Sequence, residues 1–344
     1  MKNKLQWTLL LCATLLLTGC SGKSQEIKVL QFNIWQEGTV VDGGFDAIVD
    51  EVLSSDADFV TFSEVRNYKN TRFNERIVAA LKEKGAVYYS FLSDDTGLLS
   101  RYPISDSTAT YPLSNDHGTI HRLVAKVGEA EFAIYTAHLD YLNCTYYEVF
   151  GYNGCTWKEQ TPLLNVDSII YRNNLSNRDE AIEAFLLAAQ NDINKGRIVI
   201  LGGDFNEPSL LDWTEECKNL RSHNGVSVEW PISKMLLDKG FKDSYRELYP
   251  NPLTHPGYTF PADCKSAPIN KLTWAPNADE RERIDFIYYY PNPKLILKDT
   301  KVVGPDGAIS FSKRVPDDGQ EDIIPPVGTW PTDHKAVLSS FELK

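Results

Sequence analysis

Short apolar runs that end in polar residues recur along the chain and alternate with stretches of helical spacing. Strands are expected at residues 26–35, 58–64, 97–104, 123–127, 132–137, 197–200, 282–289 and 336–342. Helices with one buried face are expected at residues 45–53, 72–84, 178–194 and 232–239. Helices that return the chain from one strand to the next are typical of an α/β protein, in which they cover the faces of a sheet.

The apolar run at 197–200 leads into a stretch that can carry chemistry, L-G-G-D-F-N-E-P at residues 201–208. In an extended strand, residues i and i+2 point the same way, so Asp204 and Asn206 are expected to share one face. Open α/β sheets place their sites at the carboxyl ends of strands, where these two residues would lie. An ordinary strand-to-turn junction is the alternative interpretation of this stretch.

Several other predicted strands also bring polar residues to their ends. The polar residues at or near strand boundaries are Asn33, Glu64, His138, Asp204, Asn206, Asp285, Asp333 and His334. Asp285 has apolar neighbours in its strand, and a buried carboxylate needs a cation or a hydrogen-bond donor. His334 precedes the last strand and is a candidate partner for Asp285.

Oxygen ligands dominate this set of residues, which suits a hard cation such as Mg²⁺ or Mn²⁺ rather than zinc. The chain contains no glycine-rich phosphate loop, G-x-S-x-G elbow or H-E-x-x-H pair among them. A histidine paired with a carboxylate, beside a metal held by acids, suits the hydrolysis of phosphate esters. The metal neutralises developing charge, a carboxylate activates water, and a protonated imidazole contacts the phosphate oxygens.

Seven short motifs follow one another along the chain: Q-F-N-I-W, S-E-V, G-L-L-S-R-Y-P-I, T-A-H-L-D, G-D-F-N-E-P, R-I-D-F-I and T-D-H. Their order resembles that of the endonuclease/exonuclease/phosphatase superfamily, which includes DNase I, exonuclease III, bacterial sphingomyelinases and inositol polyphosphate 5-phosphatases. Each motif is short, but the ordered set covers nearly the whole chain after its N-terminus. The resemblance implies a four-layer α/β sandwich, with two mixed β-sheets packed face to face and helices on the outside.

The resemblance also implies a role for each polar residue. The metal ligands that it implies are Asn33, Glu64 and Asp333, with Glu64 as the principal one. The catalytic residues that it implies are His138, Asp204, Asn206, Asp285 and His334. Asp204 would orient or deprotonate the attacking water, and Asn206 would help to hold the phosphate or the nucleophile. His138 would contact the phosphate, while Asp285 and His334 would act as a carboxylate–histidine pair.

Two long connections, residues 142–177 and 208–282, have no counterpart in the shared motifs. Both contain tyrosines and tryptophans, which suit a sugar, a ring or an acyl group beside a single phosphate. The first is expected to form a lid or a binding surface. Tyr141 and Arg178 flank it and are candidate substrate contacts, although a structural salt bridge is the preferred interpretation for Arg178.

The N-terminus resembles a bacterial lipoprotein signal. Lys2 and Lys4 precede an apolar core at 9–17, and L-T-G-C follows. We therefore expect a signal peptide at 1–19, lipidation of Cys20, a polar tether at 20–25 and a single catalytic domain at 26–344. The apolar core is too short to span a membrane, and an ordinary cleaved signal is the alternative. The expected location is periplasmic or at the cell surface, with a membrane anchor.

The charge of the chain bears on nucleic-acid binding, and its cysteines bear on disulfide formation. The chain has 35 basic and 47 acidic residues, and loss of Lys2 and Lys4 leaves 33 against 47, a net charge of −14. Without a long basic run, the mature chain lacks the electrostatic pattern of a general nucleic-acid binder. Two disulfides are expected among Cys144, Cys155, Cys217 and Cys264, with Cys144–Cys155 closing a short loop. Four reduced, buried cysteines are the alternative.

Three functions remain open from the sequence. The favoured one is an exported, monomeric hydrolase that uses Mg²⁺ or Mn²⁺ to cleave a small or lipid-linked phosphoester whose leaving group is unknown. A secreted DNase I-like nuclease is the first alternative, and the acidic charge of the mature chain disfavours it. A non-catalytic binding lipoprotein on the same scaffold is the second, and the intact set of polar positions argues against it.

Overall fold

The computed structural model describes residues 24–113 and 118–344. The expected signal peptide and Cys20 therefore lie outside the described residues. The first sheet has the strand order β10 (Leu295–Val303), β13 (Ala336–Leu343), β1 (Gln25–Asn33), β2 (Phe59–Ser63) and β3 (Thr96–Ser100). The second sheet has the order β4 (Ile104–Tyr111), β5 (Thr119–Val127), β6 (Ala130–His138), β7 (Ile198–Asp204), β9 (Asp285–Tyr289) and β8 (Lys242–Asp243).

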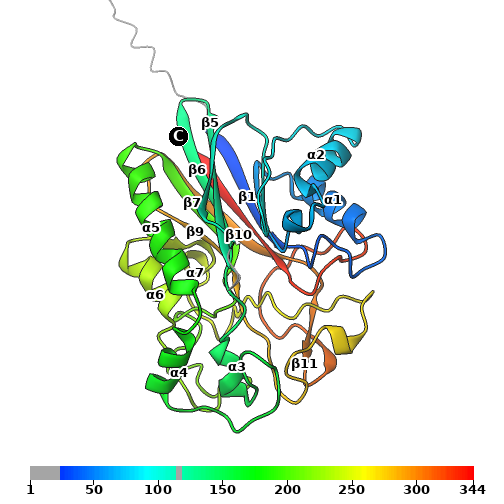
Figure 1. Ribbon diagram of the computed structural model, residues 1–344, viewed down its shortest axis with the longest axis vertical. Helices are drawn as coiled ribbons and strands as arrows, with labels where there is room; N and C mark the ends of the chain where they lie inside the picture. The colour runs from blue at the N-terminus through cyan, green and yellow to red at the C-terminus, as the bar shows by residue number, and fades with distance from the viewer. Residues whose placement is uncertain (1–23, 114–117) are drawn as a thin grey trace, which may run out of the picture.

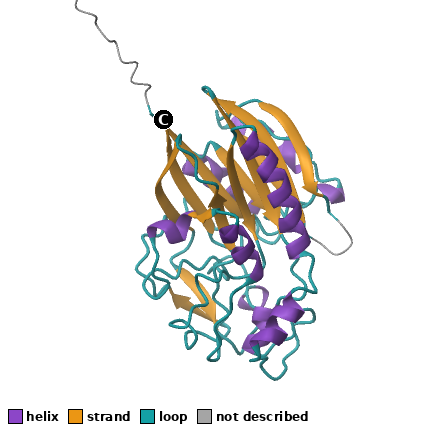
Figure 2. Cartoon of the chain, turned by 90° about the vertical axis from the view of Figure 1, so that its left-hand side faces the viewer, coloured by secondary structure: helices purple, strands orange, loops and turns teal. Residues whose placement is uncertain are grey.

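Both sheets are mixed. In the first sheet β1 runs parallel to β2 and antiparallel to β13, and in the second β6 runs parallel to β7 and antiparallel to β5. Figure 2 shows the two sheets in the upper part of the molecule, with loops and short helices below them. A separate short hairpin, β11 (Gly307–Ser310) and β12 (Lys313–Pro316), lies in this lower part.

Helices cover the outer faces of the sheets. Figure 1 shows α1 (Gly44–Ser55) and α2 (Phe73–Glu83) on one side, and α5 (Arg178–Asn194) and α6 (Pro231–Asp238) on the other. Three further helices are α3 (Thr145–Phe150), α4 (Val166–Asn173) and α7 (Ser244–Leu248), and two 3₁₀ turns are η1 (Asn67–Lys69) and η2 (Ile269–Lys271). The predicted fold class, two mixed sheets packed face to face with helices around them, is confirmed. Within the described ranges, no helix is both long enough and apolar enough to cross a membrane.

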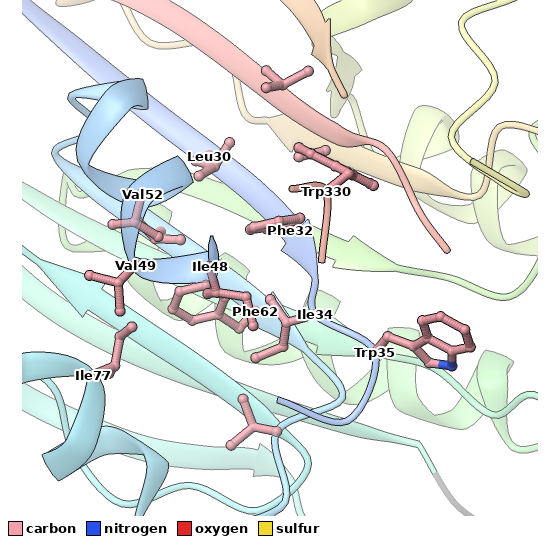
Figure 3. Close-up of a cluster of buried hydrophobic side chains, with 14 of the residues drawn as sticks. Leu30, Phe32, Ile34, Trp35, Ile48, Val49, Val52, Phe62, Ile77 and Trp330 are labelled. Carbon is pink, nitrogen blue, oxygen red and sulfur yellow. The ribbon is translucent and has the colours of Figure 1, made fainter. Parts of the chain in front are cut away.

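Alternation of side chains along the central strands explains this layering. In β1, Ile27 and Val29 belong to the buried cluster between the two sheets, whereas Leu30 and Phe32 belong to the cluster under α1 and α2. Figure 3 shows Leu30 and Phe32 among the side chains of this second cluster, together with Ile48 of α1. A strand that is buried on both faces has a continuous apolar run, which is why such runs could be recognised in the sequence.

The elements that the sequence did not predict lie where this alternation fails. β10 shifts its register against β13 between Leu297 and Asp299, and such a bulge interrupts the two-residue period. The connection at 142–177 contains α3 and α4, and Tyr146, Tyr147 and Phe150 of α3 are buried in a common cluster with Trp213. Of the two expectations for this connection, a lid or a binding surface, the structure agrees with the second: it is a packed part of the fold, and Tyr146, Tyr147 and Trp157 line a cavity.

The expectation of two disulfides is wrong for the four cysteines that the structure describes. Cys144, Cys217 and Cys264 are free and buried, and Cys155 is free and exposed. The Sγ of Cys144 donates to the carbonyl of Asn206 at 3.1 Å, so this thiol bonds to a different part of the chain from Cys155. Burial raises the pKa of the Cys144 thiol to about 12, which keeps it protonated and unreactive.

Candidate active site

The register of the second sheet brings three predicted site residues together. His138 is the last residue of β6 and pairs with Asp204, the last residue of the parallel strand β7. Asp204 also lies opposite Asp285, which begins the antiparallel strand β9. Residues that are 147 positions apart in the sequence, from His138 to Asp285, therefore meet at one edge of the sheet.

The first sheet supplies the remaining predicted residues at the same edge. Asn33 ends β1 opposite Ser63, and Glu64 follows directly after β2. β13 begins at Ala336 and runs antiparallel to β1, so Asp333 and His334 precede it beside the end of β1.

Polar contacts join the two sheets at this edge. The Nδ2 of Asn33 donates to Asp204 Oδ2 at 2.8 Å, which links the end of β1 to the end of β7. The hydroxyl of Ser63 accepts the backbone N–H of Asp204 at 3.1 Å and donates to the carbonyl of Ala137 at 3.0 Å. These buried hydrogen bonds fix the position of the Asp204 carboxylate in the otherwise apolar interior.

His334 lies between two carboxylates. Its Nδ1 is 2.8 Å from Asp285 Oδ2, and its Nε2 is 3.8 Å from Asp204 Oδ2. Burial alone would lower the pKa of His334, but the charges of Asp285 and Asp204 outweigh burial and raise it to about 10. The Nε2 of Gln31 donates to the other oxygen of Asp285 at 3.3 Å, so this buried acid has the partners that it requires.

His138 also has a carboxylate partner, Asp95, which the sequence did not predict. The Nδ1 of His138 is hydrogen-bonded to Asp95, and its Nε2 is 3.9 Å from Asp204 Oδ2. Burial opposes the charge on the imidazole, but Asp95 and Asp204 raise the pKa of His138 to about 9. Asp95 lies in the loop before β3, and its only signal in the sequence is its place just before the motif G-L-L-S-R-Y-P-I.

Asp204 and Asn206 are neighbours, but for a different reason from the one predicted. β7 ends at Asp204, and Asn206 has a left-handed backbone with φ of 50°, so the two residues do not share a strand face. The backbone N–H of Asn206 donates to Asp204 Oδ1 at 2.9 Å, and its side chain donates to the carbonyl of Leu139 at 3.0 Å. Burial, followed by the nearby charge of Asp285, raises the pKa of Asp204 to about 6.

Glu64 and Asp333 fit a divalent cation. Asp333 is 4% exposed, and burial together with the neighbouring Glu64 carboxylate raises its pKa to about 7, against the opposing effect of His334. The charge of Glu64 disfavours the charged form of Asp333, and a bound cation would relieve this repulsion. Glu64 has a left-handed φ of 66°, a backbone conformation uncommon for a residue with a side chain.

Asn33 presents its amide group to these acids as a donor. Its Nδ2 donates to Glu64 Oε1 at 3.2 Å, and its Oδ1 accepts the backbone N–H of Trp35 at 2.9 Å. In this orientation Asn33 positions Glu64 and Asp204. Asp204, Asp285 and His334 also lie close enough together to share a metal ion, which would require His334 in its neutral form.

A cavity of about 620 Å³ opens over these residues. Its polar lining residues are Gln36, Glu64, Arg66, Asp95, His138, Asp204, Asn206, Asp333 and His334. Its aromatic lining residues are Trp35, Tyr68, Tyr141, Tyr146, Tyr147, Trp157, Phe260 and Trp274. Among the described lining residues Arg66 is the one lysine or arginine. The volume suits a small molecule, with one polar and one aromatic part.

Of the two predicted substrate contacts, the structure brings one into the cavity. Tyr141 lines the cavity and is 38% exposed. Arg178 is 1% exposed and does not line it. The guanidinium of Arg178 donates to the carbonyls of Asp140 at 2.6 Å and Asn143 at 2.9 Å, and it is 3.6 Å from Glu207. Arg178 therefore holds the connection that follows β6, as the salt-bridge interpretation proposed.

The fold and the site together define a class of protein. The structure is an α/β sandwich of two mixed sheets, and its acids and histidines gather where strands of both sheets end. This is the fold that the order of the motifs along the chain implied. Residues 30–334 match the model of the Endonuclease/Exonuclease/phosphatase family. The chain belongs to this family, whose members are hydrolases that act on phosphoesters and generally depend on divalent metals.

The chain is also similar to individual proteins, at low sequence identity. The chain is 27% identical over 328 residues to "Uncharacterized protein F14F9.5" of Caenorhabditis elegans, a match that covers 92% of each protein. Its structure is similar to the catalytic domain of human Nocturnin with bound sulfate anion, at 18% identity, with 93% of this chain and 95% of that chain covered and a TM-score of 0.52. Truncated C. elegans TDP2 is 16% identical, with 92% and 97% covered and a TM-score of 0.51. At these identities the structural likeness shows the fold.

Proposed function

We propose that this protein is a phosphoesterase that uses Mg²⁺ or Mn²⁺ to hydrolyse a small or lipid-linked phosphoester by direct attack of water. The observation that carries the proposal is the meeting of two kinds of group in one cavity. Glu64 and Asp333 form an acidic pair suited to a cation, and Asp204 lies beside the cationic imidazoles of His138 and His334.

The residues divide the work of hydrolysis between them. Glu64 and Asp333 would hold a divalent cation, and such a cation would supply positive charge next to the phosphate. Asp204, with a pKa of about 6, is mostly ionised at neutral pH and can accept a proton from the attacking water. His138 and His334 remain protonated at this pH and can donate to the phosphate oxygens.

Asp285 and Asp95 support the two imidazoles. Each carboxylate bonds the Nδ1 of one histidine, Asp285 that of His334 and Asp95 that of His138. The Nε2 atom of each ring is therefore left on the side of Asp204, at 3.8 and 3.9 Å. Both histidines are held with one donor directed towards the reaction centre.

The charge of the cavity lining favours a small substrate over duplex DNA. A duplex nuclease must bind many phosphates, and lysine and arginine side chains supply much of that affinity. The described lining contains one arginine and no lysine, and the chain as a whole carries a net charge of −12. A secreted nuclease is therefore the weaker proposal.

The location and assembly of the protein are also proposals. A lipid on Cys20 would anchor the chain to a membrane after export, since the preceding residues have the charge and length of a lipoprotein signal. We propose that it acts there as a monomer, facing the periplasm or the outside of the cell.

The test is a screen of the purified protein lacking residues 1–19 with Cys20 replaced by serine. Phosphomonoesters, phosphodiesters, phospholipids and plasmid DNA are each assayed with Mg²⁺, with Mn²⁺ and with EDTA. The proposal predicts hydrolysis of a small or lipid-linked ester that EDTA abolishes and salt affects little. Rapid plasmid nicking with a steep salt dependence would instead support the nuclease. Activity that EDTA does not change would contradict both.

A further inference from the structure

The aromatic wall of the cavity has its own organisation. Trp157 lies at its centre, stacked on Tyr147 with ring centroids 5.8 Å apart and planes 14° apart. The rings of Tyr141 and Trp274 stand at 90° and 77° to Trp157, at 6.3 and 5.3 Å. All four rings line the cavity.

Two of these rings are partly exposed to solvent. Tyr141 is 38% exposed and Trp274 is 47% exposed, although both belong to a cluster whose other members are half-buried or buried. Exposed aromatic surface that gathers in a concave site indicates a ligand, because isolated exposed rings elsewhere need no such explanation.

A buried acid, Glu280, holds this wall in place. Glu280 is 1% exposed, and its Oε2 accepts the hydroxyl of Tyr147 at 3.1 Å and the backbone N–H of Trp274 at 3.0 Å. Thr273 donates to its other oxygen. Burial raises the pKa of Glu280 to about 7, so this acid is only partly ionised near neutral pH.

The residue types that line the cavity indicate whether the substrate carries a planar ring or a flexible acyl chain. The wall around Trp157 consists of flat rings, and the described aliphatic residues that line the cavity are only Leu113 and Ile284. Flat rings stack on aromatic faces in offset or edge-to-face geometry, which gains more than the area buried. A flexible acyl chain would leave gaps between rings that meet at right angles, and gaps forfeit dispersion contacts.

The lining also limits the charge of the group that lies against it. Among the described lining residues Arg66 is the one lysine or arginine, and its guanidinium lies over the ring of Tyr68, which is not one of the four rings of this wall. A second phosphate on that side would therefore have no cationic partner.

We propose that the wall formed by Tyr141, Trp157 and Trp274 binds a planar, uncharged aromatic ring attached to the single phosphate of the substrate, and that Glu280 is the positioning residue of this wall. This rests on the proposed function for the identity of the phosphate site. The shared chemistry of the substrate is a flat ring beside one phosphate, which could be an aryl group or a nucleobase.

The experiment measures binding by calorimetry with Mg²⁺, using phosphonates that the enzyme cannot hydrolyse. Benzylphosphonate, cyclohexylmethylphosphonate and hexylphosphonate carry the same anion and differ in the planarity and flexibility of the attached group. We expect benzylphosphonate to bind roughly tenfold more tightly than cyclohexylmethylphosphonate, as one favourable ring–ring contact provides. Equal affinities, or tightest binding of hexylphosphonate, would overturn the proposal.

A second pair of ligands separates the two sources of the ring. The 5′-methylenephosphonate of adenosine is compared with that of ribose alone. A gain from adenine larger than the gain from benzyl identifies a nucleobase, and a smaller gain identifies an aryl group. Either result supports a ring subsite, whereas no gain from either ring contradicts it.

Variants locate the preference on this wall. Trp157→Leu and Trp274→Leu should each reduce the benzyl-to-cyclohexylmethyl ratio towards one. Tyr171→Leu, which removes a 69%-exposed ring on α4, is the matched control and should leave the ratio unchanged. Glu280→Ala should lower the ratio, and Glu280→Gln, which keeps a hydrogen-bonding side chain, should restore it. A ratio that survives both tryptophan changes would overturn the assignment of the wall.

The binding assay does not depend on turnover. A protein that hydrolyses phosphoesters but shows no ring preference would contradict the ring subsite and leave the proposed function intact. A protein that prefers benzylphosphonate but hydrolyses none of the esters would contradict the proposed function and leave the ring subsite intact.

Discussion

The partnership of Asp95 with His138 has a consequence for stability that can be measured. Asp95→Asn keeps the size of the side chain and removes its charge, while burial continues to lower the pKa of His138. In the wild type this pKa is about 9 in the folded state, against 6.5 for an ordinary histidine. Folding therefore binds a proton at His138, and the protonated imidazole contributes to stability.

The size of this contribution follows from the shift in pKa. A rise of 2.5 units, from 6.5 to about 9, corresponds to about 3 kcal/mol at ~1.36 kcal/mol per unit. The contribution is present in full below pH 6.5 and is lost as the pH rises through about 9. We expect Asp95→Asn to lose this pH-dependent stabilisation because the imidazole then has no adjacent carboxylate at Nδ1.

The assay is urea unfolding at pH 6 and at pH 9.5. The difference in free energy of unfolding between wild type and Asp95→Asn should shrink between the two pH values by at most about 3 kcal/mol, because Asp204 and Glu64 also raise the pKa of His138 and remain in the variant. Asp94→Asn is the control, since Asp94 is 43% exposed in its side chain and pairs with His121 instead. A difference that is the same at both pH values, or the same for both variants, would refute the assignment of Asp95 to His138.

Three further predictions concern other parts of the molecule. Burial raises the pKa of Glu51 to about 7, so the ionised side chain destabilises the fold at high pH. In urea unfolding, Glu51→Gln should therefore be more stable than wild type by about 3 kcal/mol at pH 8.5 and no more stable at pH 4.5. An equal difference at both pH values would contradict this. His334→Ala and Asp285→Ala should lower kcat non-additively because the two side chains act as a unit, and additive losses in the double variant would show separate roles. Cys20→Ser should move the exported protein from the membrane fraction to the soluble fraction, and unchanged membrane binding would exclude the lipid anchor.

The apolar pattern predicted the central strands, and the resemblance to the family implied their arrangement in two packed sheets. Alternation identified β1, apolar runs identified β2, β6 and β7, and the polar residues near the ends of these strands marked the edge where the site lies. His138 and Asp204 could be assigned to this edge from the sequence because each follows a predicted strand, at 132–137 and 197–200.

The remaining parts depend on contacts that no local pattern records. Asp95 is an acid in a loop, and only the folding of that loop against β6 places it beside His138. Tyr147 and Trp274 belong to connections far apart in sequence, and their common bond to Glu280 exists only after both connections have packed. β10 was missed because its bulge breaks the alternation on which strand prediction depends.

The most direct test of the central claim is the turnover of Asp204→Asn with saturating Mg²⁺. This change keeps the shape of the side chain and removes the carboxylate that Asn33 and the backbone of Asn206 hold in place. If Asp204 positions and deprotonates the attacking water, kcat should fall by ~10³-fold or more while the melting temperature stays near that of the wild type. A folded Asp204→Asn protein with near-wild-type turnover would contradict the account.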